Sequence, residues 1–282
     1  MSLHPSRCLI CGSGDSVTVC RYHAPDAYER AVGVGEPFFI RAWVRCAECG
    51  FHYSQYSRDP DVLDRIYDEA YRAANAPWRS RSVRETFAAV TALPYERSET
   101  KQRVHWIKEQ LESLARQGRC YLNGAPCDFL DVGGGNAIFA HEFKDARWQP
   151  FVVDPSEEGA ALCHDLDIPY VRGALENASF NRDFALVAMT YVLEHLRDPL
   201  RALRAARRHV GPAGALFIEV PDAACFEDTP PDDDIFNACH LWMFGPGDLS
   251  RLLWSSGFEP VAEESTISPR GHHALKVLAV PA

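Results

Sequence analysis

The stretch DFLDVGGGNAIFA, from Asp128 to Ala140, decides the fold of this chain. An apolar run ends at Asp131, three glycines follow, and a helix-like pattern begins at once. Consecutive glycines are costly in chain entropy, so the triplet indicates a place where something must approach the backbone closely. A buried strand that turns into a helix through such a loop is typical of a doubly wound sheet, whose ligands bind beyond the carboxyl ends of its strands.

The residues from about 121 onward alternate between strand-like and helix-like patterns. Strands are predicted at 127–132, 149–154, 168–173, 183–189, 214–220 and 272–280, and helices at 136–146, 156–166, 198–211 and 246–257. In the third helix, Asp198 is the expected N-cap, Pro199 the first helical residue and Gly211 the C-terminal cap. Short apolar strands that alternate with helices predict an α/β fold with an open, mostly parallel sheet covered on both faces.

Two smaller parts precede this sheet. A helix is expected to begin at Asp59 and Pro60, and a second one carries Val104, Ile107, Leu111 and Leu114 on one stripe and ends at Gly118. We therefore predict three domains: a small metal-knuckle domain at 1–58, a helical connector or lid at 59–120, and the doubly wound domain at 121–282.

The composition is that of an ordinary globular chain, with 46% apolar and 24% charged residues. It contains no apolar run of 18 residues and does not begin with a secretory signal pattern, so we expect a cytoplasmic protein without a membrane span. The net charge of −10 argues against a broad nucleic-acid surface, although it leaves a local basic patch open.

Two cofactor classes compete for the glycine loop. A dinucleotide requires G-x-G-x-x-G/A, which from Gly133 places a small residue at position 138, where this chain has Ile138. The tighter pattern G-x-G-x-G, preceded by an acid, is matched by Asp131, Gly133 and Gly135, with Ala137 in the last position. The dinucleotide pattern therefore fails, and a merely flexible turn remains the alternative to the tighter pattern.

Four further segments match one family in the correct order. They are VRGALENASF, FALVAMTYVLEHLRDPLRAL, GALFIEVPD and HLWMFGPGDLSRLLWSSGFEPV. With the glycine loop, they make the last 160 or so residues resemble the class I S-adenosylmethionine-dependent methyltransferases. The resemblance implies a Rossmann-like methyltransferase sheet with an antiparallel last strand. Ala137 departs from it, because the family usually has glycine there.

The resemblance also implies a set of cofactor-binding residues. The methionine portion would lie on the glycine backbone, with its ammonium held by Asp131. Asp154, 23 residues further along, would accept both ribose hydroxyls. Backbone around the segment after the third strand would meet the adenine. The complete set is Asp131, Gly133, Gly134, Gly135, Asp154, Ala174, Leu175 and Thr190.

Two Cys-x-x-Cys-Gly motifs lie near the beginning of the chain. Cys8 and Cys11 form the first, Cys46 and Cys49 the second, and 34 residues separate the two motifs. Two such knuckles donate four thiolates to a closed tetrahedral site, which is structural because it has no open position. Zinc is the expected metal; rubredoxin-like iron and four unrelated thiols are the alternatives.

A metal-knuckle head, a helical connector and a methyltransferase domain together resemble the zinc-containing methyltransferases of deoxysugar pathways, which act on nucleotide-linked sugars. Carbon-methylating members usually carry a further C-terminal domain. This chain ends after the last expected strand, which weakens the expectation of carbon methylation and leaves oxygen or nitrogen methylation open. The resemblance implies a small polar acceptor such as a sugar nucleotide or glycan precursor.

A hydroxyl acceptor benefits from a general base, and histidine is the usual choice near neutral pH. His240 is the first candidate because it matches a histidine of the deoxysugar subgroup, and His195 is the second. Tyr67 and Tyr71, four residues apart on one helical face, could line the acceptor pocket or pack the connector. An inactive cofactor-binding protein and a methyltransferase for a natural product, a protein or a nucleic acid stay open as alternatives, whereas Ile138 disfavours a dehydrogenase.

Overall fold

The computed structural model describes residues 3–35, 41–71, 80–120, 122 and 126–282. The chain divides into two compact units. The first comprises Met1–Ser80, Glu194–Arg197 and Pro221–Leu249, and the second comprises Arg81–Leu193, Asp198–Val220 and Ser250–Ala282. The predicted boundaries at 58 and 120 stay a prediction. Within the described ranges, no helix is both long enough and apolar enough to cross a membrane.

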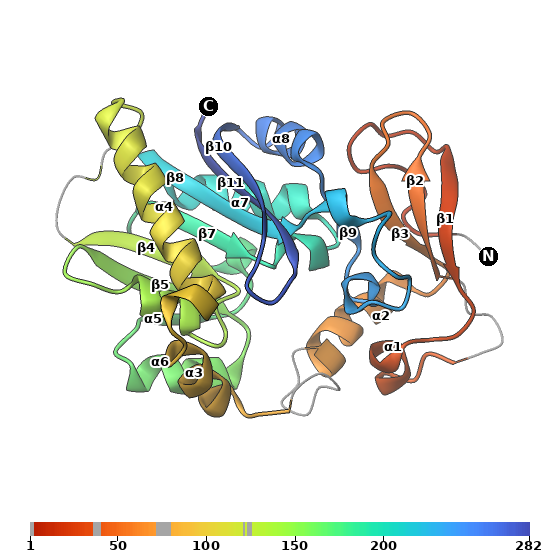
Figure 1. The fold of residues 1–282 in the computed structure, drawn as a ribbon, viewed down its shortest axis with the longest axis horizontal. Coiled ribbons are helices and arrows are strands. Elements are labelled where there is room, and N and C mark those ends of the chain that lie inside the picture. Colours follow the sequence, from red (N-terminus) through yellow and green to blue (C-terminus); the bar gives the residue numbers. More distant parts are fainter. Residues whose placement is uncertain (1–2, 36–40, 72–79, 121, 123–125) are drawn as a thin grey trace. The chain divides into compact units, whose positions relative to one another are not determined.

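The second unit is built on a seven-stranded sheet (Figure 1). In spatial order its strands are β10 (Phe258–Ile267), β11 (His273–Pro281), β8 (Val210–Pro221), β7 (Phe184–Thr190), β4 (Cys127–Val132), β5 (Trp148–Asp154) and β6 (Tyr170–Arg172). The five strands from β8 to β6 are parallel to their neighbours, and β10 and β11 form an antiparallel pair. The prediction of an α/β Rossmann-like fold around a central sheet is confirmed.

The helical segments of the second unit are α3 (Val83–Thr91), η2 (Tyr95–Arg97), α4 (Glu99–Arg116), α5 (Ile138–Phe143), α6 (Glu157–Asp165), η3 (Leu175–Asn177) and α7 (Pro199–His209). The sequence predicts the apolar stripe of α4 and the N-cap of α7, and both are confirmed. The predicted stripe of α4 is buried in one apolar cluster with side chains of α5, β4, β7 and β8. Each large apolar side chain buried in this way stabilises the fold by about 1.5–3 kcal/mol. The predicted N-cap Asp198 accepts a hydrogen bond from the amide of Arg201.

Gly211 occupies its predicted position, directly after the C-cap Val210 of α7, but it does not take the left-handed conformation of a helix-ending glycine. Val210 and Gly211 already belong to β8, where Val210 pairs with Phe184 of β7. The strand register overrides the glycine signal. Two helices, α5 and α6, are also shorter than the predicted segments 136–146 and 156–166.

The first unit contains an antiparallel sheet of four strands, β1 (Ser16–Tyr22), β2 (Arg41–Cys46), β3 (His52–Tyr56) and β9 (Trp242–Met243). Its helical segments are α1 (Ala27–Ala31), α2 (Pro60–Arg65), η1 (Ile66–Tyr71), η5 (Ala223–Cys225) and η6 (Asp234–Phe236). The predicted helix start is confirmed, since Asp59 caps α2. The same helix then widens into a π-helical turn at η1. Two elements cross the boundary between the units, η4 (Leu193–His195) and α8 (Pro246–Ser255).

Candidate active site

The glycine loop leaves the carboxyl end of β4, as the sequence predicts. Gly133 has a φ of +80°, and a Cβ atom built on it would lie 2.5 Å from Cγ2 of Val192. Its amide donates to the carbonyl oxygen of Val153 at 2.9 Å, which ties the loop to β5. Position 133 must therefore be glycine, because the backbone is in the left-handed region and Val192 leaves no space for a side chain.

Two carboxylates explain the remaining glycines of the triplet. A Cβ atom on Gly134 would lie 2.3 Å from Oδ2 of Asp131, and one on Gly135 would lie 2.9 Å from Oδ1 of Asp154. Real Cβ contacts are not that short, so only glycine at these two positions leaves room for the carboxylates of Asp131 and Asp154 beside the backbone. Sequence reasoning could not explain Gly134, because the clash is with a side chain three residues earlier that the fold turns back onto the loop.

Ala137 takes the last position of the loop in an unusual conformation. It is the N-cap of α5 with φ 56° and ψ 2°, in the left-handed region, and its side chain is fully buried. Glycine adopts this conformation without steric strain, whereas alanine adopts it at a cost of about 1–2 kcal/mol. The departure at Ala137 is accommodated by burial of its methyl group in an apolar cluster with Ala140 and Val152.

Asp154 is held in place at the carboxyl end of β5. Its Oδ1 accepts a hydrogen bond from the amide of Ser156 at 2.7 Å and lies 3.3 Å from the hydroxyl of Tyr170. Ser156 in turn caps α6 through the amide of Gly159. The side chain of Asp154 is 1% exposed, so its orientation is fixed by these neighbours rather than by solvent.

The predicted cofactor residues all belong to the second unit and follow the carboxyl ends of its parallel strands. Asp131 is the last residue but one of β4 and pairs with Val152 and Ala188, and Thr190 ends β7 opposite Glu219 of β8. Beyond β6, Ala174 and the buried Leu175 begin the turn η3. Parallel strands place their carboxyl ends at one edge of a sheet, so the topology brings these residues to one edge.

A buried ion pair that sequence reasoning missed completes this edge. Both Nε and Nη2 of Arg103 donate to the carboxylate of Glu219, the second at 3.0 Å, and both side chains are almost fully buried. Arg103 lies four residues before Ile107, on the apolar stripe of α4. A charged residue on an otherwise apolar stripe is the signal that could have indicated it.

Asp131 is an unusual carboxyl group. Burial and the nearby charge of Asp154 raise its pKa to about 8, although Arg103 acts in the opposite direction. Its Oδ2 is buried and has no hydrogen-bond partner among the described residues. A buried acceptor of this kind is unfavourable unless a ligand donates to it. The ammonium of S-adenosylmethionine is such a donor, and the glycine loop leaves backbone bare for its methionine portion, so these residues fit the cofactor.

The two candidate bases and the two tyrosines come together in the first unit. The ring centroid of His195 lies 4.8 Å from that of His240, 4.8 Å from that of Tyr71 and 5.1 Å from that of Tyr67. The tyrosines also stack on each other. Four residues from three separate segments of the chain thus form one aromatic cluster, which also contains the buried side chain of Glu194.

Backbone hydrogen bonds fix the positions of the two histidines. Nδ1 of His195 donates to the carbonyl oxygen of Cys239 at 3.0 Å, and Nδ1 of His240 donates to that of Ile235 at 2.7 Å. A carbonyl oxygen can only accept, so each Nδ1 carries the hydrogen. Burial lowers the pKa of His240 and raises that of Tyr71, so both side chains are neutral at pH 7.

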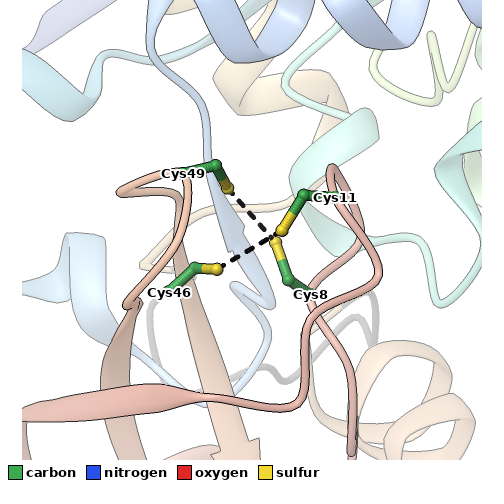
Figure 2. Close-up of side chains that lie close together, drawn as sticks. All are labelled: Cys8, Cys11, Cys46 and Cys49. Atoms are coloured by element: carbon green, nitrogen blue, oxygen red, sulfur yellow. Dashed lines mark hydrogen bonds between the residues drawn. The ribbon is translucent and has the colours of Figure 1, made fainter.

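The four knuckle cysteines converge on one point (Figure 2). Their sulfur atoms all lie within 4.8 Å of one another, with 3.6 Å between Cys8 and Cys49 and 3.5 Å between Cys11 and Cys46. Tetrahedral zinc with bonds of about 2.3 Å places its sulfur ligands about 3.8 Å apart, whereas a disulfide requires about 2.0 Å. The four-cysteine group therefore has the spacing of a tetrahedral metal site.

Each knuckle turns through the glycine that follows its second cysteine. Gly12 and Gly50 have φ of +76° and +80°, and their amides donate to the carbonyl oxygens of Cys8 and Cys46. The Cys-x-x-Cys-Gly spacing is thus explained by conformation, because only glycine adopts this turn without strain.

Replacing Gly134 by alanine tests the steric explanation of the triplet. The new Cβ would collide with the buried Asp131 carboxylate, so we expect a loss of about 1–3 kcal/mol in the free energy of unfolding. Gly247→Ala is the matched control, because a Cβ there meets nothing within 4 Å and its effect should stay within about 0.5 kcal/mol. Thermal and urea unfolding measure both, and equal stability of the two variants would contradict the explanation.

Comparison with known proteins places this site in a family. The family model described as a methyltransferase domain matches residues 95–263. Among solved structures, a 1,6-didemethyltoxoflavin-N1-methyltransferase from Burkholderia thailandensis is 16% identical, with a TM-score of 0.55 over 88% of this chain and 97% of that chain. An S-adenosylmethionine-dependent methyltransferase from Clostridium acetobutylicum is 12% identical, with a TM-score of 0.50 over 71% and 99%.

A curated relative matches a shorter region. It is a cypemycin N-terminal methyltransferase from a Streptomyces species, 26% identical over 106 residues, which are 35% of this chain and 43% of the relative. The matched part is less than half of that relative's own length. Because the family model covers more than half of the residues and the structures share the fold, the chain belongs to the methyltransferase-domain family.

Proposed function

We propose that this protein transfers a methyl group from S-adenosylmethionine to a small polar acceptor. The observation that carries the proposal is the glycine loop with Asp131 and Asp154 pressed against it at the carboxyl ends of adjacent strands. When bound, S-adenosylmethionine supplies an electrophilic methyl group on a sulfonium sulfur. Asp131 would hold the ammonium and Asp154 the ribose hydroxyls, with Thr190, Ala174 and Leu175 around the remainder.

The chemistry left to the protein is to orient the acceptor and remove its proton. With S-adenosylmethionine bound, the acceptor atom would take the methyl group, the sulfur would keep the electron pair of the broken carbon–sulfur bond, and a base of this chain would take the acceptor's proton. His240 is the proposed base, with His195 as the alternative, because both are buried and present Nε2 without the hydrogen that Nδ1 carries. Tyr67 and Tyr71 supply a flat aromatic surface beside them.

For the acceptor we propose a hydroxyl of a nucleotide-linked sugar or glycan precursor. This rests on the order of the parts, with four clustered cysteines before the methyltransferase domain, and on the stacked tyrosines, which suit a sugar ring or a base. A nitrogen acceptor in a natural product is the second candidate. It is favoured by the matched relative, whose name describes N-terminal methylation of cypemycin.

We also infer that the four-cysteine group binds one structural zinc ion. Four thiolates fill a tetrahedral shell and leave no open position, so the ion stabilises the fold and takes no part in the reaction. It would link Cys8 and Cys11 to the β2–β3 hairpin and so stabilise the fold of that part of the chain.

Binding of S-adenosylmethionine should depend on pH through Asp131. Its pKa of about 8 in the free protein means that the carboxyl group is protonated at pH 6–7, whereas the bound ammonium favours the carboxylate. Affinity should therefore rise up to about tenfold per pH unit between pH 6 and 8, with release of up to about one proton per ligand at the lower end. Calorimetry in buffers of different ionisation enthalpy measures both, and pH-independent binding would contradict the assignment.

The raised pKa of Asp131 also affects the stability of the ligand-free protein. The unfolded chain ionises Asp131 near pH 3.9 while the folded chain keeps its proton, so the free energy of unfolding falls as the pH rises from about 4 to 8. Asp131→Asn should remove this fall, raise the melting temperature at pH 7–8 and abolish the pH dependence of cofactor binding together with most of the affinity.

Loss of the proposed base should affect turnover and not cofactor binding. His240→Ala should lower the rate of S-adenosylhomocysteine formation with a panel of nucleotide-linked sugars by about 10²–10⁴-fold. Its affinity for S-adenosylmethionine should stay within about twofold, because the cofactor residues lie in the other unit. His52→Ala, a histidine of the same unit outside the cluster, is the control. Unchanged turnover in His240→Ala would exclude the base role, and cofactor binding without turnover on any acceptor would favour an inactive binding protein.

If the four-cysteine group binds zinc, the purified chain should contain the metal, and a cysteine substitution should remove it. The purified chain should contain about one thiolate-bound zinc ion, and Cys46→Ser should lose it together with about 3 kcal/mol or more of stability. Cys20→Ser, at a cysteine of the same sheet outside the group, should retain the metal. Elemental analysis and thermal unfolding measure the two effects, and full stability of the wild-type chain after complete removal of the metal would overturn the inference.

A further inference from the structure

A second group of possible metal ligands lies in the first unit, apart from the four cysteines. Glu194, His195 and His240 each offer one ligand atom, and these atoms all lie within 4.8 Å of one another. All three residues are buried, with exposed fractions of 0%, 6% and 9%. Glu194 and His195 come from one short turn and His240 from the loop before β9.

The hydrogen bonds around the group decide which nitrogen of each histidine ring carries the hydrogen. Because Nδ1 of His195 and Nδ1 of His240 donate to backbone carbonyl oxygens, each ring carries its lone pair on Nε2 when it is in the neutral form. Nε2 of His195 lies 3.7 Å from Oε1 of Glu194. A histidine whose outer N–H is held by a carbonyl oxygen is the usual form of a metal-bound histidine, since that hydrogen bond fixes both tautomer and ring orientation.

The backbone around the group is braced on several sides. The amide of Leu241 donates to the carbonyl oxygen of Glu194 at 2.9 Å, and Nε1 of Trp242 donates to that of Leu196 at 2.7 Å. Two segments that are more than 40 residues apart in the sequence are thus tied together at the point where their side chains meet. Ligands held by such bonds are preorganised before a metal arrives.

The spacing suits an ion of ordinary size. Metal–nitrogen and metal–oxygen bonds of about 2.0–2.2 Å place tetrahedral ligand atoms roughly 3.4 Å apart. The separation of 3.7 Å between His195 and Glu194 is close to this value, and side-chain movements of about 1 Å bring in the third ligand. Two imidazoles and one carboxylate favour a transition metal over magnesium or calcium, which prefer oxygen ligands only.

We propose that Glu194, His195 and His240 bind a divalent transition-metal ion, distinct from the metal of the four-cysteine group. Three protein ligands leave a coordination position open, which is the arrangement of a catalytic site and not of a structural one. The open position takes an oxygen or nitrogen atom of the acceptor.

The role of this ion in the reaction rests on the proposed methyl transfer, whereas its binding does not. A hydroxyl bound to the ion has a lowered pKa, so it releases its proton to water and presents an alkoxide to the methyl group. In this arrangement the histidines act on the acceptor through the ion, and the ion replaces the general base proposed above for a chain without a second metal. Tyr67 and Tyr71 then orient the remainder of the acceptor beside the metal.

Titration of the purified full chain with Co²⁺ tests the site. Cobalt bound by thiolates shows an intense sulfur-to-metal charge-transfer absorption, whereas cobalt bound by imidazole and carboxylate shows only weak bands. With the four-cysteine group already occupied, the wild-type chain should bind one further equivalent of Co²⁺ without new charge-transfer absorption. Glu194→Gln, which keeps the shape of the side chain, and His240→Ala should lose this equivalent, while His52→Ala should keep it.

Retention of the thiolate-bound metal shows that each variant is folded. The proposal is overturned if the wild-type chain binds no second equivalent, or if Glu194→Gln and His240→Ala bind it as the wild type does. Calorimetry with S-adenosylmethionine and assays of methyl transfer separate this result from the proposed function. If the chain transfers methyl groups but binds no second ion, the proposed function stands and the metal-site proposal is overturned. If the chain binds a second ion but no cofactor, the metal site stands and the proposed function is overturned.

Discussion

Two carboxyl groups lie directly against the backbone of the glycine loop, and this contact determines the composition of the loop and the packing of the helices beside it in the second unit. Asp131 and Asp154 end adjacent parallel strands, and both press against the loop that follows β4, at Gly134 and Gly135. Any side chain at those two positions would occupy the space of the acids. The loop therefore stays glycine, α5 must begin from the strained Ala137, and α6 packs so closely that a Cβ on Gly159 would lie 2.3 Å from the carbonyl oxygen of Gly135.

The closeness of these acids also determines the charge of the site. Buried acids at one edge of the sheet repel each other, and the fold places a buried cation, Arg103, among them. Its guanidinium is engaged by Glu219, so Asp131 remains protonated near neutral pH in the absence of a ligand. Binding sites often lower the stability of the ligand-free protein, because their buried polar groups find partners only when the ligand is bound. The first unit differs, because the buried Glu194 lies in a cluster with the rings of two histidines and two tyrosines.

Local patterns predicted much of this molecule. The alternation of strands and helices, the apolar stripe of α4 and the caps at Asp59 and Asp198 follow from interactions within a few residues, and they are confirmed. Gly211 follows the C-cap of α7 as predicted, but it lacks a left-handed conformation because pairing between β7 and β8 already begins at Val210. Arg103 was missed because its partner is 116 residues away, and nothing near it in the sequence indicates that contact.

The sequence by itself determined the fold class, the acid–glycine pattern of the loop and the two cysteine knuckles, since these depend on backbone conformation and on spacing over a few residues. Only the tertiary structure decided why Gly134 is glycine, which cation accompanies the buried acids, and that His195, His240 and Glu194 meet. These features depend on contacts between segments distant in the chain. Burial decides the ionisation of such groups, and burial is a property of the whole fold.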